Sequence, residues 1–461
     1  MHSHEAGALH AELGHPAPAW LRTPDDVNAL LPQLWPATVR RGADGAVMVG
    51  GRSVNDLAGE YGTPVYLFDE ADFRGRCRAF RDAFAGADVY YAGKAFLCRA
   101  VVRMVAEEGL GLDVCTAGEL ATAFAAGMPP ERLGLHGNNK SVQELARALD
   151  AGVGRIVLDS FDEIDRLTAL ARERRVRPAV MVRVTVGVEA HTHEYIATAH
   201  EDQKFGFSLS GGAARAAVDR VLGEGVLELR GLHSHIGSQI FDTSAFELSA
   251  RRVLGLAARV RDAYGVHLPE LDLGGGFGMA YTTQDDPASP DDLAKSLFQI
   301  VQTECSIVDL PVPQLSVEPG RAVVGPAVFT LYEVGTVKDV DGIRTYVSVD
   351  GGMSDNIRTA LYAASYSATC ASRASAAPAI LARIVGKHCE AGDIVVRDEF
   401  LPADVRPGDL LAVPGTGAYC RSMASNYNHV PRPPVVAVRD GQARVLVRRE
   451  TEADLMALDV G

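Results

Sequence analysis

The sequence lacks the features that would place the protein on a membrane or on nucleic acid. No apolar run approaches membrane-spanning length, and the N-terminus lacks the basic-then-apolar pattern of a secretory signal. Positive charge is also scarce, since 45 Lys and Arg face 59 Asp and Glu, for a net charge of −14. A chain of that sign is a poor partner for nucleic acid or anionic lipid. We therefore predict a cytoplasmic protein that binds neither.

The seven cysteines lack the spacing of a disulfide framework or of a zinc site. They are widely spread, odd in number, and contain no C-x-x-C pair, as is usual for reduced thiols. Internal repeats and low-complexity tracts are also missing. With 47% hydrophobic and 23% charged residues over 461 positions, the composition is that of a globular protein with two or three domains.

From about Asp88 onward, short apolar segments alternate with helical stretches rich in Ala, Arg, Glu and Leu. Eight strands with helical crossovers are the pattern of a (β/α)8 barrel, and eight regular units disfavour the competing doubly wound open sheet. The predicted strands are Val89–Ala92, Gly111–Val114, Leu133–His136, Arg155–Leu158, Ala179–Thr185, Leu229–His233, Leu271–Leu273 and Leu315–Val317. The predicted helices include Leu97–Glu108, Ala117–Ala126, Ser141–Ala151, Ser160–Arg175, Gly211–Leu222 and Ala245–Tyr264.

After Pro326 the helices largely stop, and short alternating segments predict antiparallel strands that the N-terminal strands also join. We therefore predict an α/β protein with a (β/α)8 TIM-like barrel and a β-rich C-terminal domain, a sandwich or barrel. The expected division is a flexible tail at 1–35, a segment at 36–65 that joins the β-domain, the barrel at 66–326 and the β-domain at 327–461. The tail carries His2, His4, His10 and His15; a metal-binding tail is the less favoured interpretation.

Chemically distinctive residues follow the predicted barrel strands, and in this fold function lies at the C-terminal ends of the strands. Such a coincidence across one barrel mouth predicts an active site. The residues, in strand order, are Lys94, Asp113, His136, His233, His235, Gly274, Gly275, Gly276, Glu318 and Arg321.

Lys94 comes directly after a short strand and Gly93. A solvated surface charge is the ordinary interpretation of one lysine at a strand end. A buried lysine is costly unless its charge is paired or its pKa falls, and a neutral amine is what Schiff-base chemistry uses. The neighbouring motifs must decide between the two.

The run Gly274–Gly276 can bring backbone N–H groups against a phosphate, in the loops that usually bind phosphate in this barrel. Arg321 would add a bidentate cation to the same anion. The alternatives are a tight turn or a Rossmann loop, although the acidic partner that a Rossmann unit requires is not evident.

Glu318 could face a pyridine nitrogen and keep it protonated, as pyridoxal phosphate requires of its electron sink. A salt bridge to Arg321 is the alternative. His233 and His235 would share one face of a strand, where a flat imidazole could stack on a cofactor ring; a structural histidine is the alternative. Lysine, phosphate site, carboxylate and stacking group together fit pyridoxal 5′-phosphate.

The same motifs occur in this order in fold-type III pyridoxal-phosphate decarboxylases: YAGKAF at 91–96, HSHIGSQ at 233–239, GGGF at 274–277, EPGR at 318–321, CE at 389–390 and GAY at 417–419. Within that group the chain resembles the diaminopimelate decarboxylases. The segments that carry the closer resemblance are 184–193, 204–207, DNIRTALY at 355–362, CEAGD at 389–393 and SMASNYN at 422–428. The similarity extends from about Trp35 to the end of the chain.

This resemblance implies that Lys94 binds pyridoxal 5′-phosphate covalently, that His235 stacks on the ring and that Glu318 pairs with its nitrogen. Ser238, Gly276, Arg321 and Tyr419 would hold the phosphate. The full cofactor-binding set that we predict is Lys94, Asp113, His235, Ser238, Gly274, Gly275, Gly276, Glu318, Pro319, Gly320, Arg321 and Tyr419. No metal is expected.

The resemblance also implies a small amino-acid substrate with a second carboxylate, bound by Arg321, Arg358, Tyr362, Glu390 and Tyr419. Cys389 would protonate the carbanion, reaching the site from the partner subunit of a homodimer; without the resemblance, a buried structural thiol is the favoured interpretation of this cysteine. Arg358 and Tyr362 are four residues apart, so one helical turn would let both grip one carboxylate; a surface helix pair is the interpretation that their spacing alone favours. Two departures from the family, Thr359 in place of proline and Ala391 in place of serine, remove no functional group.

The predicted reaction is decarboxylation of meso-2,6-diaminopimelate to L-lysine and CO2, the last step of lysine biosynthesis. One alternative is a decarboxylase on the same scaffold that acts on ornithine, arginine or carboxynorspermidine. A catalytically inactive regulator is a second, and the presence of Lys94, Cys389 and Tyr419 argues against it. A racemase of related design is a third; such enzymes usually pair the ring nitrogen with arginine, whereas this chain offers Glu318.

Overall fold

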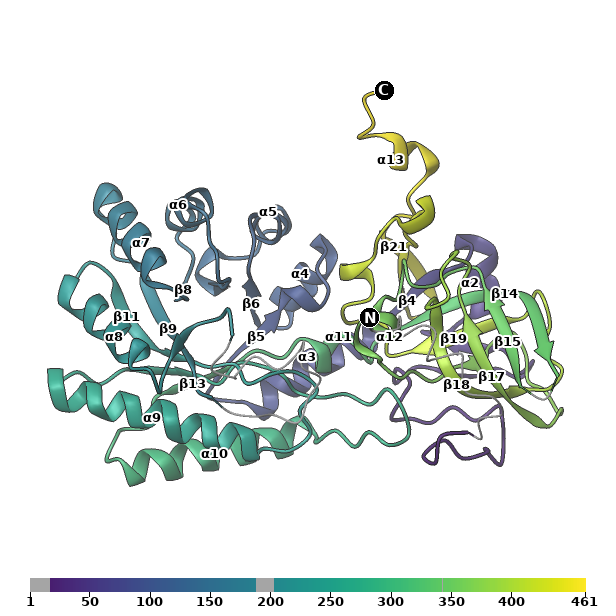
Figure 1. Ribbon diagram of the computed structural model, residues 1–461, viewed down its shortest axis with the longest axis horizontal. Coiled ribbons are helices and arrows are strands. Elements are labelled where there is room, and N and C mark those ends of the chain that lie inside the picture. Colours follow the sequence, from purple (N-terminus) through teal and green to yellow (C-terminus); the bar gives the residue numbers. More distant parts are fainter. Residues whose placement is uncertain (1–16, 188–202, 342) are drawn as a thin grey trace, which may run out of the picture. The chain divides into compact units, whose positions relative to one another are not determined.

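The computed structural model describes residues 17–187, 203–341 and 343–461. The four tail histidines, and residues 188–193 of the segment 184–193, lie outside the described residues. The chain divides into two compact units (Figure 1): Met1–Phe73, Met279–Asp286 and Val324–Gly461 form the β-rich unit, whereas Arg74–Gly278 and Pro287–Val323 form the barrel unit. Within the described residues, no helix is both long and apolar enough to cross a bilayer.

The barrel unit contains a closed cycle of eight parallel strands among the described residues. The cycle closes where β13 pairs with β5 and β8 pairs with β9, so the predicted (β/α)8 TIM-like barrel is confirmed. A short extra strand, β10 (Phe207–Ser208), pairs with β9. The barrel strands are β5 (Asp88–Ala92), β6 (Gly111–Val114), β7 (Leu133–Leu135), β8 (Arg155–Leu158), β9 (Ala179–Thr185), β11 (Glu228–His233), β12 (Glu270–Asp272) and β13 (Gln314–Val317).

Helices lie between consecutive barrel strands, and side-chain caps fix where several begin. Thr116, Ser141 and Ser160 each accept a hydrogen bond from the backbone N–H three residues on, which satisfies a donor that the helix leaves unpaired. Ser141 and Glu144 complete a capping box. The helices are α3 (Glu70–Ala83), α4 (Arg99–Glu107), α5 (Ala117–Ala126), α6 (Val142–Ala151), α7 (Phe161–Arg174), α8 (Ala213–Glu224), α9 (Ser244–Tyr264), α10 (Pro290–Ile307) and α11 (Arg321–Val324), with 3-10 turns η1 (Gly93–Ala95) and η2 (Pro130–Arg132).

A buried ion pair crosses the barrel interior. Arg155 on β8 donates to Asp272 on β12 at 2.6 Å and to Ser316 on β13 at 2.9 Å, and its guanidinium lies 3.8 Å from the ring of Tyr90. Ser316 also donates to Asp272, at 2.8 Å. Because both charges are paired and hydrogen-bonded, their burial is tolerated. The network joins strands that are far apart in sequence.

The β-rich unit is built on one large sheet in the order β18-β17-β15-β14-β4-β20-β21, with β19 also paired to β14 and β16 paired to β19. The prediction of antiparallel strands is wrong at two places, because β15 pairs with β17 and β20 pairs with β4 in parallel. A parallel pair requires a long connection between its two strands, and the chain between β15 and β17 and between β4 and β20 provides one. The strands are β4 (Val65–Asp69), β14 (Val328–Val340), β15 (Arg344–Val349), β16 (Thr369–Cys370), β17 (Ala379–Val385), β18 (Ile394–Pro402), β19 (Leu410–Pro414), β20 (Val435–Arg439) and β21 (Gln442–Val447).

The N-terminal strands belong to this unit, as predicted. β4 pairs with both β14 and β20, so a strand from the start of the chain lies inside the C-terminal sheet. A second, three-stranded sheet consists of β1 (Arg40–Arg41), β2 (Val47–Val49) and β3 (Arg52–Ser53). The remaining elements are α2 (Val54–Tyr61), α12 (Arg358–Tyr362), α13 (Glu452–Met456), η4 (Arg421–Met423) and η5 (Tyr427–His429).

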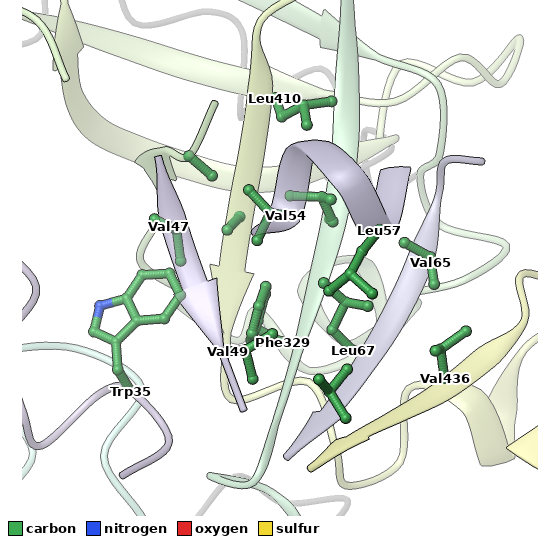
Figure 2. Close-up of a cluster of buried hydrophobic side chains, with 14 of the residues drawn as sticks. Trp35, Val47, Val49, Val54, Leu57, Val65, Leu67, Phe329, Leu410 and Val436 are labelled. Carbon is green, nitrogen blue, oxygen red and sulfur yellow. The ribbon is translucent and has the colours of Figure 1, made fainter. Parts of the chain in front are cut away.

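A hydrophobic core explains why the N-terminal strands stay with the C-terminal sheet (Figure 2). Val47, Val49 and Leu67 pack with Phe329 and Leu410, and all five are buried. Trp35 meets the ring of Phe329 edge-on at 5.7 Å. Leu34 and Trp35, which the expected division placed in the tail, are both buried in this core.

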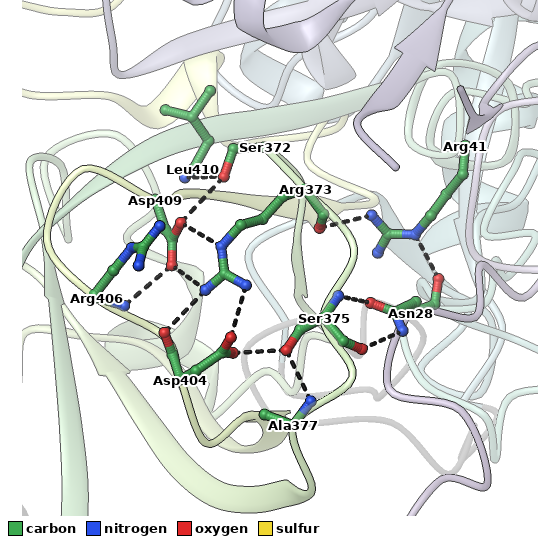
Figure 3. Close-up of polar contacts among 10 residues, drawn as sticks. All are labelled: Asn28, Arg41, Ser372, Arg373, Ser375, Ala377, Asp404, Arg406, Asp409 and Leu410. Carbon is green, nitrogen blue, oxygen red and sulfur yellow. Dashed lines mark hydrogen bonds and ion pairs between the residues drawn. The ribbon is translucent and has the colours of Figure 1, made fainter. Parts of the chain in front are cut away.

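Polar contacts join the same two parts of the chain (Figure 3). The Asn28 side chain exchanges two hydrogen bonds with the backbone of Ser375, at 2.8 and 2.9 Å. Arg41 donates to the carbonyl of Arg373, and Arg373 in turn pairs with Asp409 at 2.8 and 2.9 Å. The ordered chain near residue 28 is therefore attached to the 372–377 loop by specific contacts.

Candidate functional site

Lys94 lies in the turn η1, immediately after the first barrel strand. Gly93 must lack a side chain, because a Cβ there would lie 2.8 Å from the carbonyl oxygen of Asp113 on the next strand. Lys94 itself is exposed, so the burial that the sequence argument invoked does not occur in the single chain. Among the described residues, it makes no hydrogen bond or ion pair, which leaves its amine available at the barrel mouth.

Pro319 and Gly320 support the strand that carries Lys94. The Pro319 carbonyl accepts from the N–H of Ala92 at 3.1 Å. A Cβ at Gly320 would lie 2.9 Å from the Ala92 Cβ and 3.2 Å from that of Ala95, so only glycine permits this approach. Both residues were predicted to bind the cofactor; their observed contacts are with the segment that presents Lys94.

Four polar side chains gather at the ends of β6, β7, β11 and β13; we call Asp113, His136, His233 and Glu318 the carboxylate–histidine cluster. Glu318 Oε1 lies 3.1 Å from His233 Nε2 and 3.2 Å from His136 Nε2. His136 Nε2 also lies 3.3 Å from Asp113 Oδ1. None of these contacts is a well-aligned hydrogen bond, so the Glu318 Oε1 and both Asp113 oxygens are buried without one among the described residues.

The charges of this cluster shift one another's pKa values. Burial alone would raise the pKa of Glu318, but His136 and His233 hold it well below its usual range. Burial opposes charge on His136 as well, yet the carboxylates of Glu318 and Asp113 outweigh it and raise the pKa of His136 to about 9. Burial and the Glu318 charge raise the pKa of Asp113. Glu318 is thus kept anionic, as a carboxylate facing a protonated ring nitrogen must be.

From the sequence, His136 was identified only as a residue that follows the third predicted strand, and no chemical role was assigned to it. Its signal was its position at a strand end, and its contacts with Asp113 and Glu318 appear only in three dimensions. The ligand atoms of His136, His233 and Glu318 lie within 4.8 Å of one another, a spacing that a divalent cation would also accept. The expectation that no metal is needed stays a prediction.

His235 and His233 do not share the role that their spacing suggested. β11 ends at His233, which turns toward Glu318, whereas His235 lies beyond the strand and accepts from the N–H of Gly275 at its Nδ1, at 3.2 Å. Burial, together with the positive charges of Lys94 and Arg183, places the pKa of His235 well below its ordinary value. His235 is therefore an uncharged flat ring with a fixed orientation, which suits stacking on an aromatic cofactor.

The expected phosphate site brings together Ser238, Arg321 and the glycine loop. Arg321 donates to Ser238 Oγ from Nε at 3.2 Å and from Nη2 at 2.9 Å. Gly276 has φ +101°, and a Cβ there would lie 2.5 Å from the Gly237 carbonyl, so only glycine fits. Among the described residues the Gly276 N–H donates to no partner, so it is available to an anion.

The other two glycines have structural tasks. The Gly274 N–H donates to Asp272 at 2.7 Å, which ties the loop to the barrel's buried ion pair. The Gly275 N–H donates to His235, and a Cβ at Gly275 would lie only 2.1 Å from the Glu318 carbonyl. The sequence predicted that all three glycine N–H groups could face a phosphate. Two of them are engaged within the barrel unit, so the loop offers an anion the N–H of Gly276.

The barrel residues therefore fit pyridoxal 5′-phosphate. An exposed lysine amine, a neutral imidazole ring, a buried carboxylate without an aligned hydrogen bond and an anion site lie at the same ends of the barrel strands. The cofactor joins an aldehyde, an aromatic ring with a basic nitrogen, and a phosphate. Each part has a matching group in the barrel.

The β-rich unit contains a second distinctive group, which we call the arginine–tyrosine cluster: Tyr281, Arg358, Tyr366 and Cys420. Arg358 is 6% exposed, donates to the Tyr366 hydroxyl at 2.5 Å, and lies 4.8 Å from the Tyr281 ring. The Tyr366 hydroxyl also lies 3.6 Å from Cys420 Sγ. Within the described residues no carboxylate pairs with Arg358, and its Nε makes no hydrogen bond.

Arg358 was predicted to act together with Tyr362, but the hydroxyl that it contacts in the structure belongs to another tyrosine. α12 spans only Arg358–Tyr362, and the hydroxyl that Arg358 contacts belongs to Tyr366, beyond the helix end. Sequence spacing could not identify Tyr366, because the chain leaves the helix through Ala363 at φ +51°. Tyr362 is half-buried at the end of α12.

The remaining predicted site residues lie in the β-rich unit. Cys389 is exposed and Glu390 half-buried, in the loop between β17 and β18. Tyr419 is half-buried with φ +66°, an uncommon value for a tyrosine. All seven cysteines are free thiols, as the sequence predicted.

The fold and the barrel residues define a class of protein. Residues 70–325 match the family model described as "Pyridoxal-dependent decarboxylase, pyridoxal binding domain". The class is therefore that of the pyridoxal-dependent decarboxylases with a barrel, whose cofactor is pyridoxal phosphate.

Full-length relatives narrow the class. The chain is 56% identical to diaminopimelate decarboxylase of Mycobacterium leprae over 100% of both chains, and 58% identical to that of Mycobacterium tuberculosis over 94% of this chain and 98% of the relative. The crystal structure of diaminopimelate decarboxylase from M. jannaschii in co-complex with L-lysine superposes with a TM-score of 0.86 at 30% identity, covering 93% of this chain and 99% of that one. The chain belongs to the diaminopimelate decarboxylase family, and the resemblance found in the sequence is confirmed.

Proposed function

We propose that the protein decarboxylates meso-2,6-diaminopimelate to L-lysine and CO2, the last step of lysine biosynthesis. The observation that carries the substrate assignment is Arg358, a buried cation that pairs with no carboxylate among the described residues. Full-length relatives that share the name diaminopimelate decarboxylase support the same reaction.

A buried guanidinium without a carboxylate is costly unless a ligand supplies one. Tyr366 and the Tyr281 ring orient Arg358 through one hydrogen bond and a ring contact, but neither neutralises its charge. A substrate with a second carboxylate satisfies Arg358, whereas lysine, ornithine and arginine lack that group. We propose that Arg358, with Arg321, Tyr362, Glu390 and Tyr419, thereby selects diaminopimelate.

The barrel residues would hold the cofactor. Lys94 would bind it through its amine, His235 would support the ring face, and Ser238, Arg321 and the Gly276 N–H would receive the phosphate. Glu318, kept anionic by His136 and His233, would hold a proton on the ring nitrogen. When bound, pyridoxal phosphate supplies an electron sink for the pair that a departing carboxylate leaves behind.

The reaction breaks the bond between the carboxylate and the carbon that carries the amine. CO2 leaves without the bonding pair, and a proton must reach the carbon that keeps it. We propose that the Cys389 thiol delivers this proton and is then reprotonated from solvent. The substrate's own charge balance is preserved, because one carboxylate and one proton become CO2 and a new C–H bond.

We further propose a homodimer in which Cys389 and Glu390 of one subunit complete the barrel site of the other. Mixing Lys94→Ala, which we expect to be inactive, with Cys389→Ala, which we expect to keep only a low residual activity, tests this directly. Hybrid dimers would carry one intact site, so exchange of subunits should restore up to about a quarter of wild-type activity. A mixture whose activity stays at the level of the unmixed variants after proven exchange would contradict a shared site.

The division of the chain into a tail, a joining segment, a barrel and a β-domain at 35, 65 and 326 stays a prediction. A cytoplasmic location is likewise proposed; seven free cysteines support it, because thiols persist in a reducing compartment. Cell fractionation with an antibody against the protein tests the location.

The decisive assay is CO2 release by purified protein with pyridoxal phosphate, comparing meso-diaminopimelate with lysine, ornithine and arginine. We expect turnover of diaminopimelate at least about 10³-fold above the other three, because each leaves a buried cation unpaired. Turnover of ornithine without turnover of diaminopimelate would support a different decarboxylase. Racemisation without CO2 release would support a racemase, and binding without either would support a regulator.

A further inference from the structure

The segment Ser422–Asn428 is among the sharpest family motifs of the sequence, yet no role in the reaction has been assigned to it above. It forms the end of η4 and the start of η5 in the β-rich unit. The side chain of Asn426 donates to Glu450 at 2.6 Å, and the Ser425 N–H donates to the Ser354 carbonyl at 2.9 Å. The segment is therefore anchored at two points, and its last residue, Asn428, is held in place.

Asn428 places one oxygen between two groups of the neighbouring loop. Its Oδ1 accepts from the backbone N–H of Cys389 at 3.2 Å and lies 3.2 Å from His388 Nδ1. The backbone of Asn428 is left-handed, with φ +51°, a region that asparagine tolerates better than most residues. Residue type and backbone conformation thus agree at this position.

These contacts determine the tautomer of His388. A backbone N–H can only donate, so the side-chain atom of Asn428 that faces Cys389 must be the oxygen. His388 Nδ1 meets the same oxygen and must carry a proton. His388 Nε2 then accepts, from the Ser354 hydroxyl at 2.8 Å and from the Ser354 N–H at 3.4 Å.

The ring of His388 is fixed from several sides. It is 7% exposed and stacks on Tyr427, with ring centroids 5.3 Å apart and 29° between the planes. Its own backbone N–H donates to Asp393 Oδ2 at 2.8 Å. Ser354, His388 and Asn428 therefore form a chain of hydrogen bonds that ends on the backbone of Cys389.

We propose that Asn428 and His388 are positioning residues, which fix the backbone of Cys389 so that its thiol is presented at one place. The one contact of this chain that reaches Cys389 is to its backbone N–H, and the thiol itself is exposed. The proposal rests on the proposed function for the identity of the proton donor, since it assigns a role to the residues behind that donor. The placement of Cys389 by Asn428 does not depend on the substrate.

The first test measures that placement without substrate. Asn428→Gly keeps the left-handed backbone and removes the oxygen, whereas the matched control Asn428→Asp keeps an acceptor for both donors. We expect residue-resolved hydrogen exchange at the Cys389 amide to quicken about fivefold in Asn428→Gly, because a hydrogen bond of about 1 kcal/mol is lost, and little in Asn428→Asp. Equal exchange in wild type and both variants would overturn the proposal.

The second test asks whether the effect passes through the thiol. We expect Asn428→Gly to lower kcat about 10–100-fold with a KM change below about threefold, and Asn428→Asp to retain kcat within about threefold. In a Cys389→Ala background the same substitution should change kcat by less than about twofold, because the group it positions is gone. Equal losses in both backgrounds would show a general structural role and overturn the proposal.

A second variant covers the case in which Asn428→Gly does not fold. His388→Phe keeps a flat ring over Tyr427 but offers no proton to Asn428, and we expect the same kcat loss, again absent in the Cys389→Ala background. If diaminopimelate proves not to be a substrate while the Cys389 amide still responds to Asn428→Gly, the proposed function fails and the positioning stands. If decarboxylation is intact in every Asn428 and His388 variant, the positioning fails and the proposed function stands.

Discussion

The carboxylate–histidine cluster of the barrel and the arginine–tyrosine cluster of the β-rich unit handle buried charge in opposite ways. In the first, Glu318 has two histidines within 3.2 Å, and His136 lies between two carboxylates. In the second, Arg358 is buried beside two tyrosine rings and a thiol, with no described carboxylate as partner.

The difference indicates which kind of ligand each cluster is suited to bind. The barrel cluster has its charges largely matched within the chain, so it can hold a fixed protonation state for a bound ring. The arginine–tyrosine cluster leaves a positive charge uncompensated, so it favours an anion. We therefore propose that the carboxylate–histidine cluster tunes the bound cofactor and that the arginine–tyrosine cluster selects the substrate.

The largest expected effect is that of Lys94→Ala. Removing the only side chain proposed to bind the cofactor through its amine should lower kcat by about 10³-fold or more, because the reacting groups act as a unit. CO2 release and the visible absorbance of the bound cofactor should fall together. Lys295→Ala, an exposed lysine on α10, is the matched control and should leave both unchanged. Retained visible absorbance in Lys94→Ala would contradict the assignment.

Arg358→Met tests whether the arginine–tyrosine cluster binds the second carboxylate of the substrate. The methionine fills similar space without charge, and we expect kcat/KM for diaminopimelate to fall about 10²–10³-fold, since a buried charge contact of 2–5 kcal/mol is lost. Turnover of lysine should change by less than about threefold, so the ratio between the substrates should collapse. Arg439→Met, at a half-exposed arginine, is the control. An equal loss for both substrates would mean that Arg358 only supports the fold.

We expect the carboxylate–histidine cluster to make the stability of the cofactor-free protein depend on pH. Because the pKa of folded His136 is about 9 and its ordinary value is 6.5, its contribution is fully present below pH 6.5 and is lost as pH rises through 9. The shift corresponds to about 3 kcal/mol. The thermal midpoint should therefore fall over that window in wild type and fall less in His136→Asn.

His267→Asn, at an exposed histidine of the same unit, should keep the full wild-type fall. The comparison uses differential scanning calorimetry at several pH values between 6 and 9.5. Identical pH profiles for wild type and His136→Asn would show that Glu318 and Asp113 do not hold a proton on His136.

The smallest expected effect is that of Ser238→Ala. Arg321 would lose a hydroxyl acceptor at 2.9 Å, and the phosphate one donor, so the Kd of pyridoxal phosphate should rise about tenfold. Fluorescence titration of the cofactor-free protein measures it. Ser306→Ala, on the exposed side of α10, should leave the Kd unchanged. A rise in KM for diaminopimelate at constant cofactor Kd would place Ser238 on the substrate side.

Much of the barrel was predictable, because strand and helix periods are local. The expected helix at 117–126 is observed residue for residue, with Thr116 as its cap. The helix expected from Leu97 begins at Arg99 instead, since the backbone of Cys98 is extended directly before it. The parallel pairings of β15 with β17 and of β20 with β4 were missed, because pairing between distant strands leaves no period in the sequence.

In the candidate site, too, some residues were predictable from the sequence and others were not. Lys94, Glu318 and Arg321 were identified from residue type and position at strand ends. His136 and Tyr366 were given no role, since each meets its partner across a distance in sequence: His136 meets Glu318 over 182 positions, and Tyr366 meets Arg358 beyond the end of a helix. Pro319 and Gly320 were predicted as cofactor contacts, and the structure shows them packed on the Lys94 segment.

By itself the sequence determined the eight-strand alternation, the residues at the strand ends and the family resemblance, because these depend on local pattern and residue identity. Only the tertiary structure decided the charge states of the histidines, the tasks of the individual glycines and the hydrogen-bond chain from Ser354 through His388 to Asn428. The physical reason is that a pKa, a close backbone approach and a tautomer depend on which groups lie within about 3 Å, and the fold, not the order of residues, sets that distance.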